Sequence, residues 1–237
     1  DVKREDIFVQ SKCGIVPGVM YDLSKKHILE SVDGILKRLD MEYLDALVLH
    51  RPDALVEPEE VAAAFDELEK SGKVRHFGVS NQKPMQIELL KRYVKQPIEI
   101  DQLQLSIPCS NMITNGMEVN MASEGAVDRD GSVLDYCRLN DITIQAWSPF
   151  QYGFFEGVFI GNEEKYPKLN AVLNELADKY NVSPSGIATA WILRHPAGIQ
   201  MIAGSTSRKH MQEIIDGSHV TLTREEWYRL YLAGDHI

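Results

Sequence analysis

The stretch LDALVLHRPD, residues 44–53, decides how the rest of this sequence is interpreted. Its first part is a nearly continuous apolar run, which is typical of a strand covered on both faces in a parallel sheet. The run ends in an imidazole, His50, and Arg51-Pro52-Asp53 then breaks the strand pattern. A histidine at the last position of a buried strand lies between core and solvent, a poor place for packing and a good place for chemistry. His50 is therefore the first candidate functional residue.

Short apolar runs alternate with longer amphipathic segments along the chain. Strands are predicted at residues 7–12, 44–50, 73–80, 98–106, 142–148 and 198–205. Helices are predicted after Ser24, a typical N-cap residue, with Ile28, Val32, Ile35, Leu36 and Leu39 on one face, between Pro58 and Gly72, and at residues 83–94, 132–140, 167–180, 184–194, 207–216 and 223–232. Residues 107–131 and 149–166 are predicted as long loops.

This alternation indicates an α/β fold with a parallel sheet and helical crossovers. Six strand–helix units fit either an open sheet or an incomplete eight-fold barrel. No GxGxxG motif follows any strand, which argues against a Rossmann dinucleotide site. Without an internal repeat or a linker, residues 1–237 are predicted to form a single domain.

The composition is that of an ordinary globular protein, and it argues against several classes of partner. Of the 237 residues, 44% are hydrophobic and 25% are charged, with a formal net charge of −10. Because no basic stripe is present, nucleic-acid binding is not expected, and no apolar run approaches the roughly 20 residues of a membrane span. Three widely spaced cysteines, Cys13, Cys109 and Cys137, predict a reducing, cytoplasmic compartment. No cluster of Cys and His suggests a metal site.

Polar and aromatic side chains gather at the predicted carboxyl ends of the strands. In a βα barrel, chemistry is built where strands meet the loops that follow them. These ends carry Lys12, His50, Ser80-Asn81, Gln102, Trp147-Ser148 and Gly204-Ser205-Thr206. Each has an ordinary structural interpretation when taken alone: Lys12 as a solvated strand end, Ser80-Asn81 as a helix cap, Trp147 as barrel packing. Their joint occurrence at one edge of the sheet predicts a functional site.

Seven segments, in order, carry a resemblance to a known family. They are REDIFVQSK (4–12), DALVLHRPD (45–53), SGKVRHFGVSN (71–81), IEIDQLQLS (98–106), ITIQAWSPF (142–150), SPSGIATAWILRHP (183–196) and AGSTSRKHMQEI (203–214). The set resembles the aldo-keto reductases, and within them bacterial oxidoreductases. The resemblance implies a (β/α)8 TIM barrel and a cytoplasmic NADP-dependent oxidoreductase that reduces aldehydes and ketones to alcohols. It also implies a small-molecule carbonyl substrate and a monomer or small homo-oligomer.

The same resemblance implies roles for the strand-end residues. The family uses a tetrad of Asp, Tyr, Lys and His, of which Lys12 matches the lysine and His50 the histidine. An ammonium group beside a tyrosine lowers the pKa of that acid, and the imidazole donates a hydrogen bond that polarises the substrate carbonyl. Cofactor-binding positions are matched by Ser80, Asn81, Gln102 and Trp147 around nicotinamide, and by Ser148, Gly204, Ser205, Thr206, Arg208 and His210 around the phosphates.

The sequence departs from the family pattern near the adenosine 2′-phosphate. Many members carry Lys at the position of Gly204 and Arg at that of His210, whereas here the nearby positive charges are Arg208 and Lys209. NADP is expected as the cofactor, with NAD less favoured.

The Asp and Tyr of the tetrad belong to the first two strand–helix units of the barrel, which have no match in residues 1–237. We therefore expect a longer protein, extended at the N-terminus and by a few residues at the C-terminus. Tyr43 precedes its strand and is not expected to replace the tyrosine of the tetrad.

Two further expectations concern the substrate and a different class of function. The residues Ile107, Trp147, Phe150, Phe154 and Phe155 predict an apolar substrate pocket. A nicotinamide-binding regulatory subunit without turnover is the alternative to an enzyme. The presence of both Lys12 and His50 favours the enzyme, because a protein that only binds the cofactor has no need of them.

Overall fold

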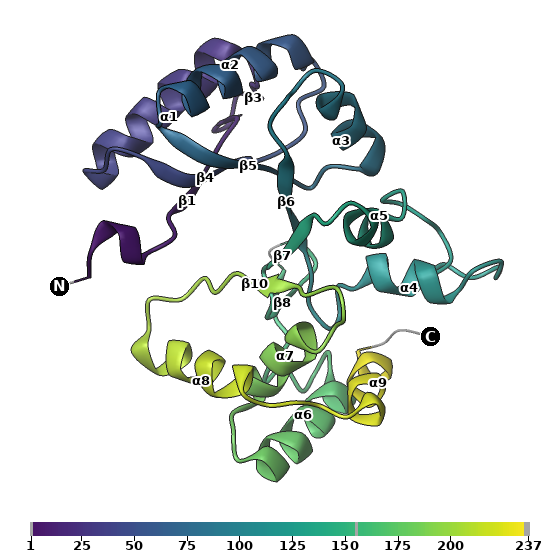
Figure 1. Ribbon diagram of the computed structural model, residues 1–237. Coiled ribbons are helices and arrows are strands. Elements are labelled where there is room, and N and C mark those ends of the chain that lie inside the picture. The colour runs from purple at the N-terminus through teal and green to yellow at the C-terminus, as the bar shows by residue number, and fades with distance from the viewer. Residues whose placement is uncertain (1, 155, 235–237) are drawn as a thin grey trace. The chain divides into compact units, whose positions relative to one another are not determined.

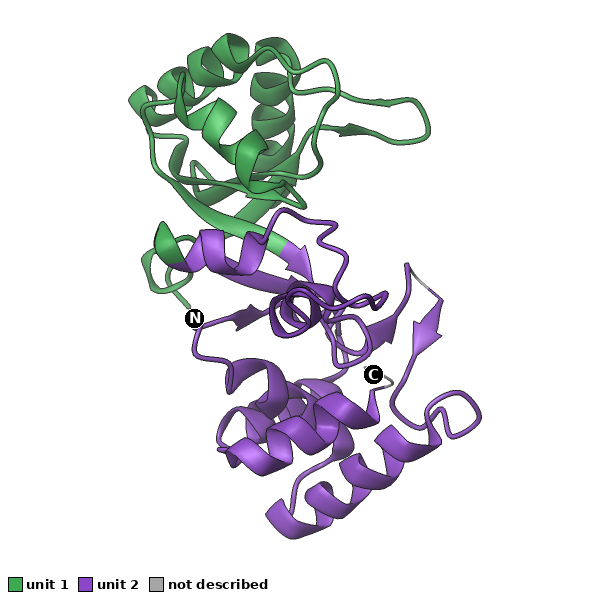
Figure 2. Ribbon diagram, turned by 90° about the vertical axis from the view of Figure 1, so that its right-hand side faces the viewer, with its two compact units in different colours: residues 1–102, 139–142 green, residues 103–138, 143–237 purple. Residues whose placement is uncertain are grey.

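The computed structural model describes residues 2–154 and 156–234, and the chain divides into two compact units (Figures 1 and 2). Unit 1 comprises residues 1–102 and 139–142, and unit 2 comprises residues 103–138 and 143–237. Each unit has its own set of buried apolar side chains. The single domain expected over residues 1–237 stays a prediction.

Unit 1 is built on four parallel strands in the order β1-β4-β5-β6. Its elements are η1 (Arg4–Asp6), β1 (Gln10–Cys13), β2 (Ile15–Val16), β3 (Met20–Tyr21), α1 (Lys25–Leu39), β4 (Leu44–Leu49), α2 (Pro58–Lys70), β5 (Val74–Ser80), α3 (Pro84–Lys91) and β6 (Ile98–Gln104), whose last two residues belong to unit 2. In Figure 1, α1 and α2 cover one face of β1, β4 and β5. The small antiparallel hairpin β2–β3 was not predicted from the sequence.

The strand predicted at residues 44–50 is confirmed as β4, and all six of its residues are buried. Even Asp45 is only 7% exposed, because Arg4, Arg75 and the backbone N–H of Val9 donate hydrogen bonds to its carboxylate. His50 follows β4 directly and is half-buried. Its backbone N–H donates to the carbonyl of Cys13 at 2.8 Å, which fixes the end of β4 beside the end of β1.

Ser24 caps α1, as predicted, by accepting a hydrogen bond from the backbone N–H of His27. Four of the five apolar residues expected on the inner face of this helix are buried, and Leu39, the last helical residue, is 43% exposed. Between β5 and β6 the backbones approach closely at Gly78. A Cβ atom there would lie 2.7 Å from Cβ of Ile100, so a larger residue would push β5 away from β6 and misplace Ser80.

Unit 2 contains the parallel pair β7 and β10 together with most of the remaining helices. Its elements are α4 (Asn111–Met117), α5 (Val133–Leu139), whose last residue belongs to unit 1, β7 (Thr143–Trp147), β8 (Gln151–Tyr152), β9 (Gly157–Val158), α6 (Pro167–Tyr180), α7 (Pro184–Leu193), β10 (Gln200–Met201), α8 (Arg208–Ser218) and α9 (Arg224–Ala233). Helix α7 packs against both α6 and α8. The α7–α8 approach is closest where Gly217 faces Gly186, since a Cβ on Gly217 would lie 2.3 Å from the carbonyl oxygen of Gly186.

Three segments of unit 2 differ from their predictions. The predicted loop 107–131 contains α4, whose weak helix formers are stabilised by the burial of Met112, Ile113 and Thr114. The predicted loop 149–166 contains the antiparallel hairpin β8–β9. The strand predicted at 198–205 is shortened to β10. Among the described residues β10 pairs only with β7, and the last backbone bond of that ladder joins Ile202 N–H to the carbonyl of Ala146.

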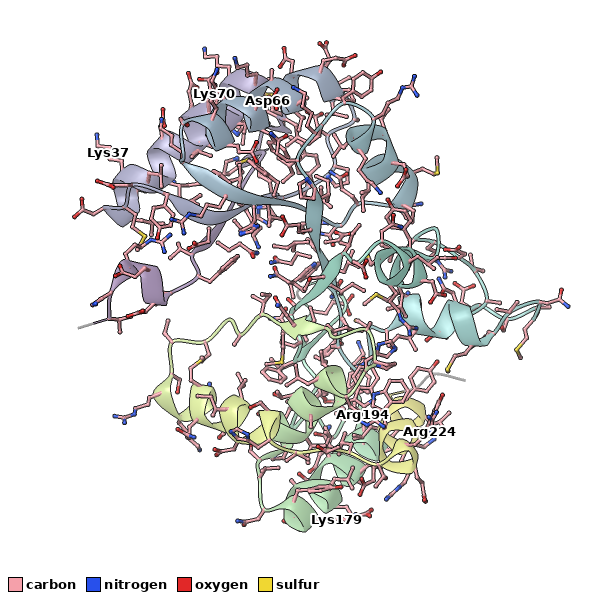
Figure 3. The ribbon with its side chains drawn as sticks, in the orientation of Figure 1. Lys37, Asp66, Lys70, Lys179, Arg194 and Arg224 are labelled. Atoms are coloured by element: carbon pink, nitrogen blue, oxygen red, sulfur yellow. The ribbon has the colours of Figure 1, made fainter. Side chains whose placement is uncertain are left out.

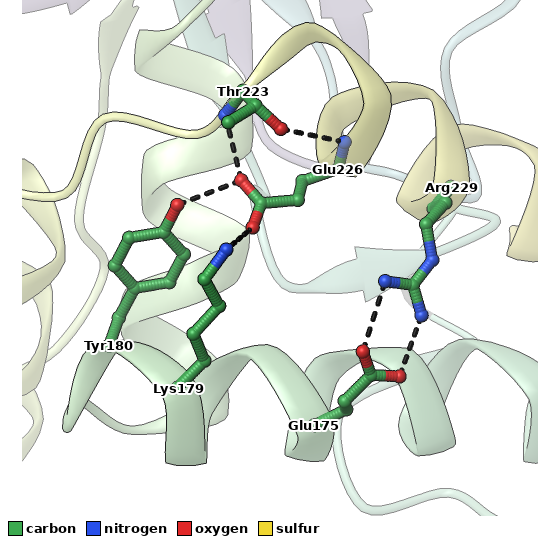
Figure 4. A network of polar contacts seen from close by, with 6 residues as sticks. All are labelled: Glu175, Lys179, Tyr180, Thr223, Glu226 and Arg229. Carbon is green, nitrogen blue, oxygen red and sulfur yellow. Dashed lines mark hydrogen bonds and ion pairs between the residues drawn. The ribbon is translucent and has the colours of Figure 1, made fainter.

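A buried carboxylate joins α6 to α9 (Figure 4). Glu226, in the first turn of α9, accepts hydrogen bonds from Lys179 and from the hydroxyl of Tyr180. It also completes a capping box with Thr223: its carboxylate accepts from the Thr223 N–H at 2.8 Å, and its own N–H donates to the Thr223 hydroxyl at 3.2 Å. Burial acts to raise the pKa of Glu226, but the hydrogen bonds from Lys179, Thr223 and Tyr180 outweigh it and hold the pKa at about 2.

Glu226→Gln should destabilise the fold at neutral pH, and the cost should vanish in acid. A carboxyl group whose folded pKa is depressed contributes stability above its unfolded pKa, here 4.5, and loses it as the pH falls through the folded value. We expect the variant to lower the free energy of unfolding by up to about 3 kcal/mol at pH 7, with the difference shrinking between pH 5 and pH 2.

Urea unfolding at a series of pH values measures this effect. Glu175→Gln is the matched control, because Glu175 forms an exposed ion pair with Arg229 in the same pair of helices (Figure 4). Its cost should be small beside that of Glu226→Gln, because solvent screens an exposed ion pair. A cost for Glu226→Gln that does not change with pH would contradict a role for the buried charge.

Candidate functional site

Hydrogen bonds join four of the predicted site residues of unit 1. Nζ of Lys12 donates to Oε1 of Gln102 at 2.6 Å. The hydroxyl of Ser80 donates to the Gln102 carbonyl at 2.8 Å, and Nδ2 of Asn81 donates to the Ser80 hydroxyl at 2.8 Å. Lys12 comes from β1 and Gln102 from β6, with β4 and β5 between them in the sheet. Since neighbouring strands lie about 4.8 Å apart, this contact requires a strongly curved sheet, as in the wall of a barrel.

Lys12 and His50 form an electropositive group at the ends of β1 and β4. Burial lowers the pKa of Lys12, and the nearby charge of Arg51 lowers it further. Burial also lowers the pKa of His50, with additional contributions from Lys12 and Arg51. His50 is therefore a neutral imidazole at neutral pH and can donate one N–H bond. Burial and neighbouring cations raise the free energy of the charged forms of Lys12 and His50. A negative charge that develops next to them would therefore be stabilised.

Asp101 is a residue of this region that the sequence analysis missed. It is fully buried in β6 next to Gln102. Burial raises the pKa of Asp101 to about 8, and the backbone N–H groups of Gln82 and Asn81 counter part of the shift. Because successive side chains of a strand point to opposite faces, the Asp101 side chain lies on the face of β6 opposite to that of Gln102, and among the described residues neither of its carboxyl oxygens has a hydrogen-bond partner. The available signal was a carboxylate inside an apolar strand, IEIDQLQ.

The backbone of Asn81 makes that turn unusual. Its φ of 54° lies in the left-handed region, which asparagine tolerates better than most residues. Its N–H donates to the Gln102 carbonyl at 3.1 Å. The left-handed turn ends β5 and places the Asn81 amide beside Ser80.

A pocket of about 450 Å³ in unit 2 brings together four of the predicted phosphate-binding residues. Ser148, Gly204, Ser205 and His210 line it, and most of its other lining residues are apolar, among them Ile202. Trp147, Thr206 and Arg208 adjoin these residues in sequence but are not among the described residues that line the pocket. Ser185, at the start of α7, is a lining residue that the sequence analysis did not identify.

The polar end of this pocket is the N-terminus of α8. Ser207 caps the helix by accepting from the backbone N–H of His210. The hydroxyl of Ser205 accepts from the Ser207 N–H at 3.1 Å and lies 3.5 Å from Nδ1 of His210. The backbone N–H groups and positive dipole end of α8, together with Arg208 in its first turn, suit an anion. A Cβ at Gly204 would meet nothing within 4 Å, so packing does not exclude a lysine there.

Trp147 is the last residue of β7 and is half-buried. Its indole meets the ring of Phe154 edge-on, with centroids 6.4 Å apart. Of the other residues expected in an apolar pocket, Ile107 is fully buried in the core, Phe150 lines the 450 Å³ pocket, and Phe155 lies outside the described residues.

Tyr43 lies at the opposite end of β4 from His50. Its ring is held between two guanidinium groups, Arg4 at 3.9 Å and Arg75 at 3.8 Å from the ring centroid. This position agrees with the expectation that Tyr43 does not replace the tyrosine of the tetrad. Within residues 2–154 and 156–234, no group of three His, Cys, Asp or Glu side chains could hold a metal ion. Over the same residues, no helix combines the length and the apolar character needed to cross a bilayer.

Comparisons with known proteins agree in covering nearly the whole chain. The model of the Aldo/keto reductase family matches residues 1–232. The uncharacterized oxidoreductase YcsN of Bacillus subtilis is 35% identical over 97% of this chain and 74% of its own length. A 6-dehydroglucose reductase of Agrobacterium fabrum is 30% identical over 96% of this chain and 72% of its own length. Among solved structures, the thermostable aldo-keto reductase Tm1743 in complex with the inhibitor epalrestat superimposes with a TM-score of 0.75 at 26% identity, covering 98% of this chain and 73% of that one.

Proposed function

Because the chain belongs to the aldo/keto reductase family, we propose that it is an NADPH-dependent reductase of aldehydes and ketones. The observation that carries the proposal is the group formed in unit 1 by Lys12 of β1, His50 directly after β4, and Gln102 of β6. Family membership also implies the (β/α)8 barrel expected from the sequence. That two strand–helix units precede β1 stays a prediction, as does the cytoplasmic location.

Each unit, taken by itself, carries side chains suited to part of a nicotinamide dinucleotide. In unit 1, Ser80, Asn81 and Gln102 supply the hydroxyl and amide groups that a carboxamide needs. In unit 2, Trp147 supplies an aromatic face, and the pocket at the start of α8 supplies hydroxyl and N–H donors for phosphates. When bound, NADPH supplies the hydride for the reduction.

The chain's own residues act on the substrate carbonyl and on the acid that protonates it. His50, neutral at neutral pH, donates a hydrogen bond to the carbonyl oxygen and stabilises the negative charge that develops there. The proton for that oxygen comes from the tyrosine that the family resemblance implies. In this proposal the ammonium group of Lys12 stabilises the phenolate left behind, which lowers the pKa of the acid toward neutral pH.

Trp147→Ala should weaken NADPH binding several-fold and remove most of the quenching of protein fluorescence that NADPH causes. The physical reason is the loss of the aromatic face, since base–aromatic stacking contributes about 1–3 kcal/mol per base in other sites. A fluorescence titration of the intact gene product measures both quantities. Trp191→Phe is the control, because Trp191 is buried in unit 2 between α7 and α9. If the titration curves of Trp147→Ala matched those of the parent, Trp147 would contribute only to packing and not to cofactor binding.

Removing Arg208 and Lys209 together should reduce the preference for NADPH over NADH. Both side chains are exposed at the start of α8, and Lys209 lies 3.9 Å from Glu213, so Arg208 is expected to carry more of the effect. In the parent, the preference should shrink as salt rises, because exposed charges are screened. Dissociation constants for both cofactors at low and high salt test this. An unchanged preference in Arg208→Ala/Lys209→Ala would show that other residues recognise the 2′-phosphate.

The alternative function is that of a nicotinamide-binding regulator without turnover. It shares the cofactor residues with the enzyme, so binding measurements do not separate the two. The two functions are separated by assaying a panel of aldehydes and ketones with NADPH. The panel includes 6-dehydroglucose, because the relative from Agrobacterium fabrum is named for its reduction.

A further inference from the structure

A second pocket of unit 2, of about 350 Å³, lies among α4, α5, α9 and the segment that follows α7. It shares no lining residue with the pocket at the start of α8. Its charged and imidazole side chains are those of Arg194, His195, Arg224 and Asp135. Figure 3 shows both arginines beside α9. None of these residues has a part in the proposed carbonyl reduction.

Trp227, which forms one wall of this pocket, is held in a rigid aromatic stack with Trp191 behind it. The rings of Trp227 and Trp191 are nearly parallel, with an interplanar angle of 8° and centroids 4.9 Å apart. Each indole N–H donates to the backbone carbonyl of the other residue, at 3.0 and 3.1 Å. Met112 and Met117 of α4 are among the apolar residues of the lining, and methionine adapts readily to the shape of a flat ligand. The pocket thus presents a fixed aromatic surface beside an adaptable one.

The positive charges of the pocket come from Arg194 and Arg224. Nε of Arg194 donates to the carbonyl of Leu222 at 2.9 Å, which fixes the guanidinium plane, and no other described residue accepts a hydrogen bond from its two terminal nitrogens. Arg224 is the first residue of α9 and is exposed. Among the described residues, neither guanidinium forms an ion pair, and the acidic lining residue Asp135 instead lies 3.8 Å from Arg138.

His195 adds a neutral donor to these charges. Its Nδ1 accepts a hydrogen bond from the backbone N–H of Ala197 at 3.2 Å. Burial lowers the pKa of His195, with a further contribution from Arg138 and an opposing one from Asp135. The neutral imidazole therefore carries its proton on Nε2 and can donate it to an anion.

We propose that this pocket binds a small organic anion, a carboxylate carried on a flat apolar body. Guanidinium groups bind carboxylates through paired hydrogen bonds, and the apolar body would lie against Trp227 and the methionines of α4. The volume is within the range of small-molecule sites, about 300–1,000 Å³. A net positive pocket also stands out in a chain whose formal net charge is −10. A bare inorganic anion would leave the apolar part of the lining uncovered.

The probe for this site is 2-naphthoate, titrated calorimetrically into the intact gene product in saturating NADPH. Saturable binding with a single site is expected, and 2-naphthamide, which has the same body without the charge, should bind at least about tenfold more weakly. Inorganic phosphate at the same concentration should not displace 2-naphthoate.

Two variants locate the binding. A Cβ on Gly116 would meet nothing within 4 Å, so Gly116→Phe can project a ring into the pocket while improving the helix propensity of α4. It should abolish binding while the melting temperature is kept or raised. Arg224→Gln should weaken binding about fivefold or more. Arg92→Gln, which removes an exposed arginine of unit 1, is the matched control and should change nothing.

Three results would overturn the proposal. They are the absence of saturable 2-naphthoate binding, equal binding of the acid and the amide, and binding that both Gly116→Phe and Arg224→Gln leave unchanged. Because NADPH is present throughout, failure of the proposed carbonyl reduction would leave this test unaffected.

Discussion

Lys12→Met in the intact gene product should lower the rate of aldehyde reduction by about 100-fold or more, the usual scale for a lost acid–base partner. The methionine keeps the length of the stem while removing the charge that stabilises the phenolate. The pKa of the tyrosine acid should therefore rise, and the pH at which the rate declines should move with it. NADPH affinity should stay within a few-fold of the parent.

The change in the pH profile separates a catalytic role of Lys12 from a structural one. A variant that merely loosened the hydrogen bond to Gln102 would lower cofactor affinity without moving the profile. Lys37→Met, which alters an exposed lysine of α1 (Figure 3), is the matched control and should behave as the parent. Reduction by Lys12→Met at the parental rate would exclude the family mechanism and favour the regulator.

His50→Ala should lower turnover by about 10²–10³-fold, the range found when one preorganised donor to a developing oxyanion is lost. The loss should be largest for poorly activated ketones, because these need the most polarisation of the carbonyl. Since the pKa of His50 lies below its ordinary value of 6.5, the parental rate should show no titration of this group above pH 6.5.

Steady-state rates for a matched ketone and aldehyde provide the measurement for His50. His50→Gln retains an N–H donor and should recover part of the activity that His50→Ala loses. Equal losses for ketone and aldehyde, with no recovery by glutamine, would show that His50 acts through packing instead of through the carbonyl.

The sequence predicts an element correctly where consecutive residues determine that element. The apolar run before His50 predicts β4, and Ser24 predicts the start of α1. Both predictions succeed because the burial of a strand and the capping of a helix depend on residues that are adjacent in the sequence. The positions of Lys12, Ser80 and Asn81 near strand ends followed from the alternation of strands and helices, whereas Gln102 lies inside β6, two residues before its end. Their functional roles came from the family resemblance.

Features that depend on distant residues were not predictable in this way. The contact of Lys12 with Gln102 spans 90 residues and depends on the curvature of the sheet, which no local pattern encodes. Helix α4 consists largely of weak helix formers that burial stabilises, so propensity alone indicated a loop. The pocket between Arg194 and Arg224 is assembled from four separate segments, and no pattern within a single segment indicates that they meet.

The most direct measurement of the proposed carbonyl reduction follows the hydrogen that is transferred. The intact gene product is incubated with NADPH deuterated at C4 of the nicotinamide and with the panel of aldehydes and ketones. The alcohols are then analysed by mass spectrometry. We predict that at least one alcohol carries a single deuterium on the former carbonyl carbon, and that Lys12→Met and His50→Ala slow its formation in parallel with NADPH consumption. Tight NADPH binding with no deuterated alcohol from any member of the panel would contradict the reductase and leave the cofactor-binding regulator in its place.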